Sequence, residues 1–183
     1  MKIREINAMR GPNYWSVRRH KLIVLVLDLE DMEERPSNLI EGFSERLEAM
    51  FPTMYEHRCS EGVPGGFFYR VKKGTWMGHI IEHIALEIQT LADMDTGFGR
   101  TRGYGEKGVY NVVFSYIEES AGRYAAEAAV RICEALIVGE QYDMTDDMEY
   151  DIINGREYAM TDDREYGMID DGEYVNSIIG NMK

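Results

Sequence analysis

The segment from Gly74 to Glu87 has the sequence Gly-Thr-Trp-Met-Gly-His-Ile-Ile-Glu-His-Ile-Ala-Leu-Glu, which contains the pattern His-x-x-Glu-His. An α-helix advances about 100° per residue, so a helix here brings His79 and His83 together one turn apart, with Glu82 close beside them. Two imidazoles and a carboxylate are the groups with which a zinc hydrolase holds its ion and takes a proton from water. The residue order is that of the inverzincin motif, the reverse of His-Glu-x-x-His.

The flanking residues predict an amphipathic helix over residues 75–92. Apolar side chains recur at intervals of three and four residues and form a stripe that we expect to face the core, namely Met77, Ile81, Ile84, Ile88 and Leu91. The motif residues lie roughly opposite this stripe, and Leu86 lies on their side, which indicates that this side is partly covered. Two interpretations stay open for the motif: a metal or catalytic site, or solvated polar residues on the outer side of the helix.

Length and composition limit the class of protein. A chain of 183 residues can bury one good core with an appendage. It has no apolar run of membrane-spanning length and no leader after Met1, so we expect a cytoplasmic protein without a membrane partner. Cys59 and Cys133 lack Cys-x-x-Cys spacing and are expected to be free thiols. As metal ligands they are less favoured than histidine and carboxylate, because neither lies near the motif in sequence.

Charge is distributed unevenly along the chain. The formal net charge is −13, and residues 140–183 hold 13 acidic against 3 basic side chains. The preceding residues hold 20 acidic and 17 basic side chains, an ordinary globular balance. Neither part has the basic excess that phosphate binding requires, so nucleic acid is not an expected partner. The acidic tail instead favours a cationic, arginine-bearing partner.

Hydrophobic patterning predicts an α+β fold, a small mixed domain with helices packed on one sheet in the order β-β-α-α-β-α. We expect strands at 2–9, 21–29 and 109–116, and helices at 37–50, 75–92 and 118–137. Ser37 is the expected N-cap of the first helix. Residues 59–68 and 95–108 are rich in glycine and are expected to be loops.

The chain divides into a domain at 1–140 and an acidic octapeptide-repeat tail at 141–183. Tyrosine recurs every eight residues in this tail, at Tyr142, Tyr150, Tyr158, Tyr166 and Tyr174. Its Asn-Gly and Asp-Gly pairs are typical of two-residue hairpin turns, which favours a β-meander. Six-residue strands between such turns place successive tyrosines on opposite faces, so we expect either bulged turns or order gained from a neighbour. Exposed strand edges recruit partners, so the tail favours a homo-oligomer.

Seven segments, spread in order across the first domain, carry a resemblance to a known family. They are Arg10-Gly-Pro-Asn-Tyr-Trp-Ser16, Arg18-Arg-His-Lys21, Gly74-Thr-Trp-Met-Gly-His79, Glu82-His83, Gly97-Phe-Gly-Arg-Thr-Arg102, Val109-Tyr110 and Ala121-Gly-Arg-Tyr-Ala125. With these segments the first 140 residues closely resemble the N-terminal domain of cyanophycin synthetase. Full-length members of that family build a poly-aspartate backbone with arginine on each side chain, using an ATP-grasp domain and a Mur-ligase-like domain that follow this one.

The chain departs from the family where an ATP-grasp module would begin, because tyrosine octads stand there instead and the sequence stops at Lys183. We therefore expect that it is not a complete ATP-dependent ligase on its own. The resemblance implies the share of the N-terminal domain: holding cyanophycin or a related polymer of aspartate and arginine, docking to a cyanophycin synthetase and, in some members, zinc-dependent hydrolysis of the polymer.

The resemblance also implies roles for individual residues. His79 and His83 become zinc ligands and Glu82 the general base, and a third protein ligand leaves the fourth position for water. Glu119, at the start of the last long helix, is the expected third ligand, with Glu118 as the alternative.

Two arginines are candidates for substrate binding. Arg100 and Arg102, in the glycine-rich segment after the motif, are candidates to bind a substrate carboxylate or to stabilise an oxyanion; the alternative is that they are ordinary surface arginines. The chain is then either a zinc metallopeptidase-like hydrolase that cuts the polymer internally or a non-catalytic module that docks polymer or synthetase. The intact motif favours the enzyme.

Overall fold

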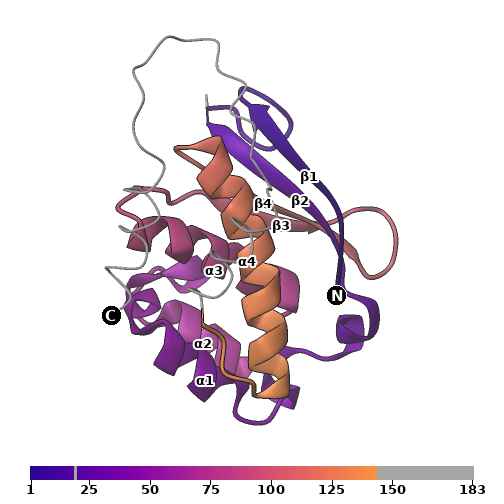
Figure 1. The fold of residues 1–183 in the computed structure, drawn as a ribbon, viewed down its shortest axis with the longest axis vertical. Coiled ribbons are helices and arrows are strands. Elements are labelled where there is room, and N and C mark those ends of the chain that lie inside the picture. Colours follow the sequence, from indigo (N-terminus) through magenta and orange to yellow (C-terminus); the bar gives the residue numbers. More distant parts are fainter. Residues whose placement is uncertain (19, 144–183) are drawn as a thin grey trace.

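The computed structural model describes residues 1–18 and 20–143 (Figure 1). The predicted octad tail lies outside these residues, apart from its first three. No helix in the described ranges is both long enough and apolar enough to cross a membrane.

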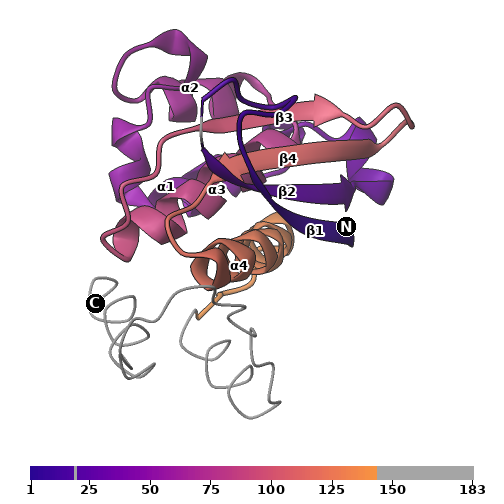
Figure 2. The ribbon, with the colours of Figure 1, turned by 90° about the horizontal axis from the view of Figure 1, so that it is seen from above.

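A four-stranded antiparallel sheet forms one layer of the domain. Its strands are β1 (Lys2–Arg10), β2 (Lys21–Asp28), β3 (Gly99–Gly103) and β4 (Val109–Ser115), in the spatial order β1-β2-β4-β3. Every neighbouring pair is antiparallel, and the β1–β2 ladder shifts register once near its start. Figure 2 shows the two edge strands, β1 and β3, on opposite sides of the sheet.

Four α-helices form the rest of the domain: α1 (Phe43–Met50), α2 (Gly66–Lys73), α3 (Met77–Leu91) and α4 (Glu119–Val138). Helix α3 packs beneath β3 and β4, and α4 packs beside it beneath β1 and β2. The α+β class and the packing of helices on one sheet are thus confirmed.

Short 3-10 helices make up much of the connection between β2 and α2. They are η1 (Glu30–Glu34), η2 (Ser37–Leu39), η3 (Pro52–Glu56) and η4 (Cys59–Glu61). Helix α2 packs against η2, η3 and η4, and α3 also contacts η3. This connection, together with α2, therefore covers part of α3.

The main core lies between the sheet and the helices. Successive side chains of a strand point to opposite faces, so β2 sends Ile23, Leu25 and Leu27 towards α3 and α4. A smaller cluster lies on the other face, where Trp15 and Phe98 pack against three buried residues of β2 and β4, namely Leu22, Val24 and Val113. Burial on both faces explains the continuous apolar run of β2.

The helix expected at 37–50 begins later than predicted. Its α-helical part starts at Phe43, after Gly42, whose φ of 68° places it in the left-handed region. Ser37 does not cap it, because the Ser37 hydroxyl donates to the Val71 carbonyl and accepts from the Thr75 amide. The Ser37 side chain therefore makes a tertiary contact instead of the local cap that the sequence predicted.

Two expected loops contain regular structure. Helix α2 begins inside the segment predicted to be a loop at 59–68, and β3 forms inside the one at 95–108. Strand β3 is short and begins and ends with glycine, so local patterning gives no strand signal, and pairing with β4 creates the strand. The strands at 2–9, 21–29 and 109–116 and the helices at 75–92 and 118–137 are confirmed to within two residues at each end.

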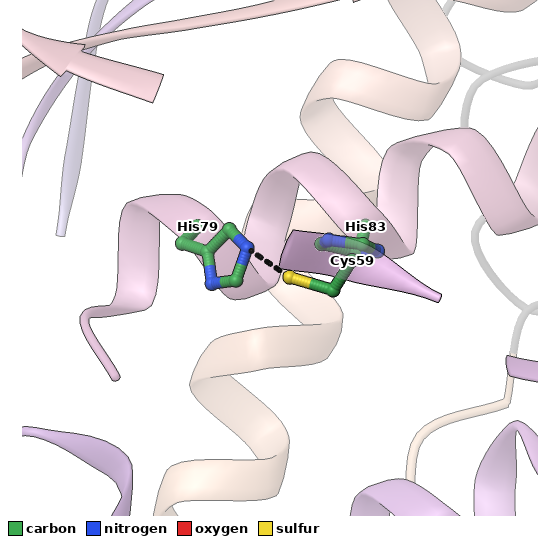
Figure 3. A group of neighbouring side chains, drawn as sticks. All are labelled: Cys59, His79 and His83. Carbon is green, nitrogen blue, oxygen red and sulfur yellow. Dashed lines mark hydrogen bonds between the residues drawn. The ribbon is translucent and has the colours of Figure 1, made fainter. Parts of the chain in front are cut away.

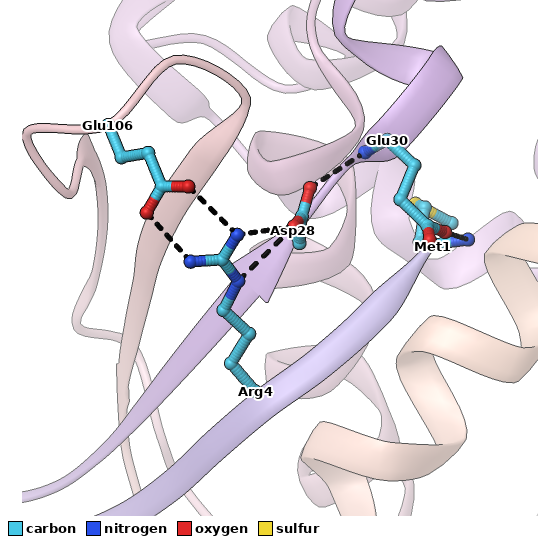
Figure 4. Close-up of polar contacts among 5 residues, drawn as sticks. All are labelled: Met1, Arg4, Asp28, Glu30 and Glu106. Atoms are coloured by element: carbon cyan, nitrogen blue, oxygen red, sulfur yellow. Dashed lines mark hydrogen bonds and ion pairs between the residues drawn. The ribbon is translucent and has the colours of Figure 1, made fainter.

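Arg4 ties together three parts of the sheet's outer face (Figure 4). Its guanidinium donates to Asp28 at the end of β2, with Nη2 to Oδ2 at 2.6 Å, and to Glu106 in the β3–β4 turn, with Nη1 to Oε2 at 2.8 Å. This ion pair lowers the pKa of both carboxyl groups. These contacts join β1 and the end of β2 to the β3–β4 turn. Because they are accessible to solvent, they have little effect on the free energy of unfolding.

Gly66 allows a close approach that positions η4. A Cβ built on Gly66 would lie 2.5 Å from the carbonyl oxygen of Arg58 and 2.8 Å from the Cβ of Glu61. Both contacts belong to the segment around Cys59, and one of them is backbone. Only glycine at the first residue of α2 therefore lets this segment pack against the helix.

The substitution Gly66→Ala is expected to lower the free energy of unfolding by about 1–3 kcal/mol, because the backbone around Arg58 must shift. Gly97→Ala is the matched control, since a Cβ at Gly97 meets no atom within 4 Å. Urea denaturation of both variants checks this. Equal stability of the two variants contradicts the close-approach argument.

Candidate metal and catalytic site

Helix α3 is buried on almost every side, including the side that carries the motif. Glu82 is 6% exposed and His83 is 8% exposed, while His79 is partly buried. The interpretation that these are solvated residues on an outer face is therefore wrong. Segments η3, η4 and α2 cover the histidines, whereas β3 covers Glu82. Leu86, whose side of the helix was expected to be partly covered, is 7% exposed.

Three possible metal-ligating atoms converge beside α3: Cys59 Sγ, and one nitrogen each from His79 and His83 (Figure 3). These atoms all lie within 4.8 Å of one another, and Cys59 Sγ lies 3.3 Å from His79 Nε2. The two histidines are one turn apart on α3, whereas Cys59 comes from η4, 20 residues before His79. The packing of η4 against α2 is what brings the thiol to the helix.

Phe67 of α2 holds the imidazoles from one side. Its ring stacks on that of His83, with centroids 4.2 Å apart and planes inclined by 29°, and it meets His79 edge-on at 6.0 Å. The two imidazoles are themselves perpendicular, with centroids 4.8 Å apart. Aromatic packing of this kind restricts ring rotation, so the histidines are held in place without a bound ion.

Burial keeps both imidazoles neutral at physiological pH. Loss of solvation lowers the pKa of His79 to about 4, and the positive charge of Arg70 adds to the effect. Loss of solvation also lowers the pKa of His83 well below the ordinary value, with further contributions from His79 and His57. A metal ion requires an unprotonated imidazole nitrogen, so this burial favours metal binding.

A buried chain of hydrogen bonds runs away from His83 to a carboxylate. His57 Nδ1 lies 3.0 Å from His83 Nδ1, and His57 Nε2 lies 2.8 Å from Glu87 Oε2. Glu87 is only 1% exposed and also accepts a hydrogen bond from the Thr53 hydroxyl. The carboxylate of Glu87 is therefore bound on both oxygens, which is what a buried carboxylate needs.

The direction of these hydrogen bonds follows from the acceptors. A carboxylate only accepts, so His57 Nε2 carries the proton that is donated to Glu87. We predict that His57 Nδ1 accepts and that His83 Nδ1 donates across the 3.0 Å contact between them. With this direction His83 carries its proton on Nδ1, and its Nε2 keeps the free lone pair.

His79 has a polar group beside each ring nitrogen. Its Nδ1 lies 3.0 Å from the Thr75 hydroxyl oxygen, and its Nε2 faces Cys59. With Nδ1 donating to Thr75, both motif histidines present Nε2 as the ligand atom. Partners of this kind on the second nitrogen orient metal-ligating imidazoles and set their tautomer.

Glu82 points to the sheet rather than into the cluster of sulfur and nitrogen atoms. Its Oε2 accepts from the Thr101 hydroxyl at 2.6 Å, and its carboxylate packs against Gly99, where an added Cβ would clash with it. Burial raises the pKa of Glu82 to about 7, against the opposing effects of the Thr101 hydrogen bond and of Arg100. A carboxyl group with this pKa is suited to exchange a proton near neutrality.

Arg100 and Arg102 lie on the face of the sheet opposite to Glu82. They pair with Val113 and Asn111 of β4, whereas Thr101, which contacts Glu82, points to the other face. The Arg100 guanidinium lies over the Phe98 ring, 5.8 Å from its centroid. Neither arginine is therefore placed to stabilise an oxyanion at the histidine cluster. Binding of a substrate carboxylate by these arginines stays a prediction.

Glu119 is not brought to the histidines. It begins α4, is exposed, and pairs with Arg123 one turn later at 2.8 Å. Glu118, the alternative, is the exposed N-cap residue of the same helix. The atoms that converge on His79 and His83 include neither carboxylate, and Cys59 takes the place expected for Glu119.

Local sequence reasoning missed Cys59, His57 and Glu87. Cys59 and Cys133 are both free thiols, as expected, but Cys59 was less favoured as a ligand than histidine and carboxylate because it is distant from the motif in sequence. His57 and Cys59 are two residues apart in a chain with only four histidines and two cysteines, and this pairing is the signal that was available. Glu87 follows His83 by four residues on the same helix, which was a second signal.

Comparison with known proteins agrees with the resemblance inferred from sequence. Residues 24–138 match the family described as the cyanophycin synthase-like N-terminal domain. The chain is 56% identical over 146 residues to cyanophycin synthetase of Synechocystis sp., which covers 80% of this chain and 17% of that protein. It is likewise 56% identical over 146 residues to cyanophycin synthetase of Geminocystis herdmanii, and 55% identical over 142 residues to that of Nostoc sp..

These matches define the family. The chain belongs to the cyanophycin synthase-like N-terminal domain family, and the resemblance is confirmed. It spans about a sixth of the length of these curated relatives.

The hydrogen-bond chain from Glu87 predicts different effects for two substitutions of His57. In His57→Asn the amide oxygen replaces Nδ1 as acceptor for His83, so zinc affinity should stay within about threefold of wild type. In His57→Gln the amide reaches the position of Nε2 instead, and zinc affinity should fall about 10–100-fold. Competition with a chromophoric chelator measures both affinities.

Nitrogen NMR of the zinc-free protein gives an independent check, because the two tautomers of His83 have distinct ring shifts. We expect the proton on Nδ1 in wild type. A proton on Nε2 of His83, or equal zinc affinity in the two variants, contradicts this assignment.

Proposed function

We propose that this domain is a zinc-dependent hydrolase that cuts an arginine-bearing poly-aspartate chain internally. The observation that carries the proposal is the convergence of Cys59 Sγ and two neutral imidazoles at one point beside α3. The proposal concerns residues 1–140. The acidic octad tail expected at 141–183 and its self-association stay predictions.

The donor set fits zinc. Thiolate and imidazole are the preferred ligands of this ion, and tetrahedral bonds of about 2.0–2.3 Å place ligand atoms roughly 3.3–3.6 Å apart. The 3.3 Å between Cys59 Sγ and His79 Nε2 lies at the short end of that range. Three protein ligands also leave one position for water or substrate, as in catalytic rather than structural zinc sites.

When bound, zinc supplies a Lewis acid that polarises a carbonyl group and makes water more acidic. The protein supplies the proton acceptor. Glu82 leaves α3 about 60° around the helix from His79, on the side nearest the sheet, and its pKa of about 7 suits it to take a proton from water and return it to the leaving amine. The covering segments exclude bulk solvent from these groups.

The substrate class follows from the relatives. They are named cyanophycin synthetase, and the family resemblance implies that cyanophycin is an arginine-bearing poly-aspartate. A domain of that family with hydrolytic groups has this polymer as its natural substrate. The charges of the domain support it, because two arginines lie on β3, the strand that contacts Glu82.

One observation favours a second function, a non-catalytic module that docks polymer or synthetase. The Glu82 carboxylate is already engaged by Thr101 and packed against Gly99, which is what a purely structural buried glutamate would show. In that case the cysteine and histidine cluster holds zinc for stability alone. Cleavage of the polymer separates the two functions.

Zinc content tests the ligand set. Cys59→Ser and His79→Ala should each lose the stoichiometric zinc that wild type retains after dialysis. Cys133→Ala is the matched control, because Cys133 is a buried free thiol outside the cluster and the variant should keep its zinc. With Co²⁺ in place of zinc, the thiolate-to-metal absorption should vanish in Cys59→Ser alone of the two cysteine variants. Identical zinc content in Cys59→Ser and Cys133→Ala would contradict the proposed site.

The role of Glu82 is tested with the zinc-loaded protein and soluble cyanophycin in the absence of ATP. Wild type should shorten the polymer, and Glu82→Gln should keep zinc but cleave at least about 100-fold more slowly, because an amide does not accept the proton. Glu48→Gln, an exposed position on α1, is the control. Unchanged polymer length with zinc-loaded wild type leaves the docking function.

A further inference from the structure

Strand β3 is an open edge of the sheet beside the proposed site. It pairs only with β4 in the part of the chain that the structure describes, and Figure 2 shows it as the border strand farthest from β1. Thr101 of this strand also contacts α3, through its hydroxyl group, at Glu82 and at the Gly78 carbonyl. The open edge is therefore adjacent to the helix that carries the motif.

The backbone groups that face the open edge can be identified from the pairing pattern. Ser115 donates to the Phe98 carbonyl and Tyr104 donates to the Val109 carbonyl, so even-numbered residues of β3 form the hydrogen-bonded pairs with β4. The N–H and C=O groups of odd-numbered residues point the other way. Gly99, Thr101 and Gly103 thus direct their backbone groups outwards, where an added strand would pair.

The side chains of β3 alternate between the two faces in the complementary pattern. Thr101 points towards Glu82, while Arg100 and Arg102 lie on the outer face. Within the described ranges, neither guanidinium has a carboxylate within 4 Å, in contrast to Arg4 and Arg123, which are both in ion pairs. Two cations without a carboxylate partner at alternate positions of an edge strand favour a ligand that carries two anions at the same spacing.

We propose that the outer edge of β3 binds an extended polypeptide as an added strand, with carboxylates on its alternate residues placed against Arg100 and Arg102. Alternate residues of a strand recur every 6.6–6.8 Å or so, which is the same repeat on both partners. Backbone hydrogen bonds supply affinity, and the two arginines select a chain whose carboxylates recur at this spacing.

The occupant rests on the proposed function. In an arginine-bearing poly-aspartate every residue carries an arginine with a free carboxylate, so a strand of this polymer presents a carboxylate at every second residue on each face. One set of branches then meets Arg100 and Arg102. The other set is directed to the face of Thr101 and Glu82, where hydrolysis is proposed.

Gly103 allows a sharp test of strand addition. An added Cβ there meets no atom within 4 Å, and the pairing pattern directs the Gly103 backbone groups away from β4. Gly103→Pro removes an outward N–H and places its ring in the path of an added strand, whereas Gly103→Ala keeps the N–H. Thr101 is unsuitable because its hydroxyl contacts Glu82.

The experiment measures binding of soluble cyanophycin to Glu82→Gln protein, so that cleavage does not interfere. Adding Gly103→Pro should weaken binding about tenfold, roughly the effect of losing one hydrogen bond at a buried contact, and adding Gly103→Ala should leave it unchanged. Adding Arg102→Gln should weaken binding and reduce its dependence on salt, while Lys107→Gln in the same hairpin should do neither. Thermal unfolding of each variant shows that the fold is intact.

Equal binding by the proline and alanine variants overturns strand addition. This outcome is distinct from failure of the proposed hydrolysis. If wild type binds but does not cut the polymer, and Gly103→Pro weakens that binding, the edge site stands and the enzyme does not. If Gly103→Pro cuts and binds the polymer as wild type does, hydrolysis stands and the edge site does not.

Discussion

Helix α3 carries ionisable side chains into the interior of the domain, and the surrounding structure gives each of them a partner. A buried polar group without a hydrogen bond costs several kcal/mol, so this requirement constrains everything that packs on the helix. The pairs are Glu82 with Thr101, His79 with Thr75 and Cys59, His83 with His57, and Glu87 with Thr53 and His57. Strand β3, the segment from η3 to η4 and Thr75, just before α3, provide these partners.

These partners lie on two different sides of α3. The side covered by η3, η4 and α2 gathers neutral imidazoles and a thiol, which are ligands for a borderline-soft cation. The side under the sheet holds one carboxyl group whose pKa burial has raised to about 7. The proposed hydrolysis requires both sides, and β3, an edge strand among the described residues, contacts α3 at Glu82 and Gly78.

Much of this was accessible from the sequence. The continuous apolar run of β2, the pattern of α3 and the long alanine-rich α4 depend on local periodicity, and they were placed within two residues. His79, Glu82 and His83 were found because helical spacing alone makes them neighbours. The resemblance to the cyanophycin synthetase N-terminal domain is carried by short motifs and is likewise a property of the sequence.

Tertiary structure decided the rest, because the missing contacts join segments that are distant in the chain. Cys59 became a ligand candidate only when Gly66 let η4 pack against α2, and Glu119 was lost from the set because α4 begins away from the histidines. The Ser37 hydroxyl bonds to Val71 and Thr75, more than 30 residues away, instead of capping the helix that follows it. The sequence by itself determined which side chains α3 presents; only packing determined which groups meet them, since burial makes partners obligatory without specifying where in the chain they arise.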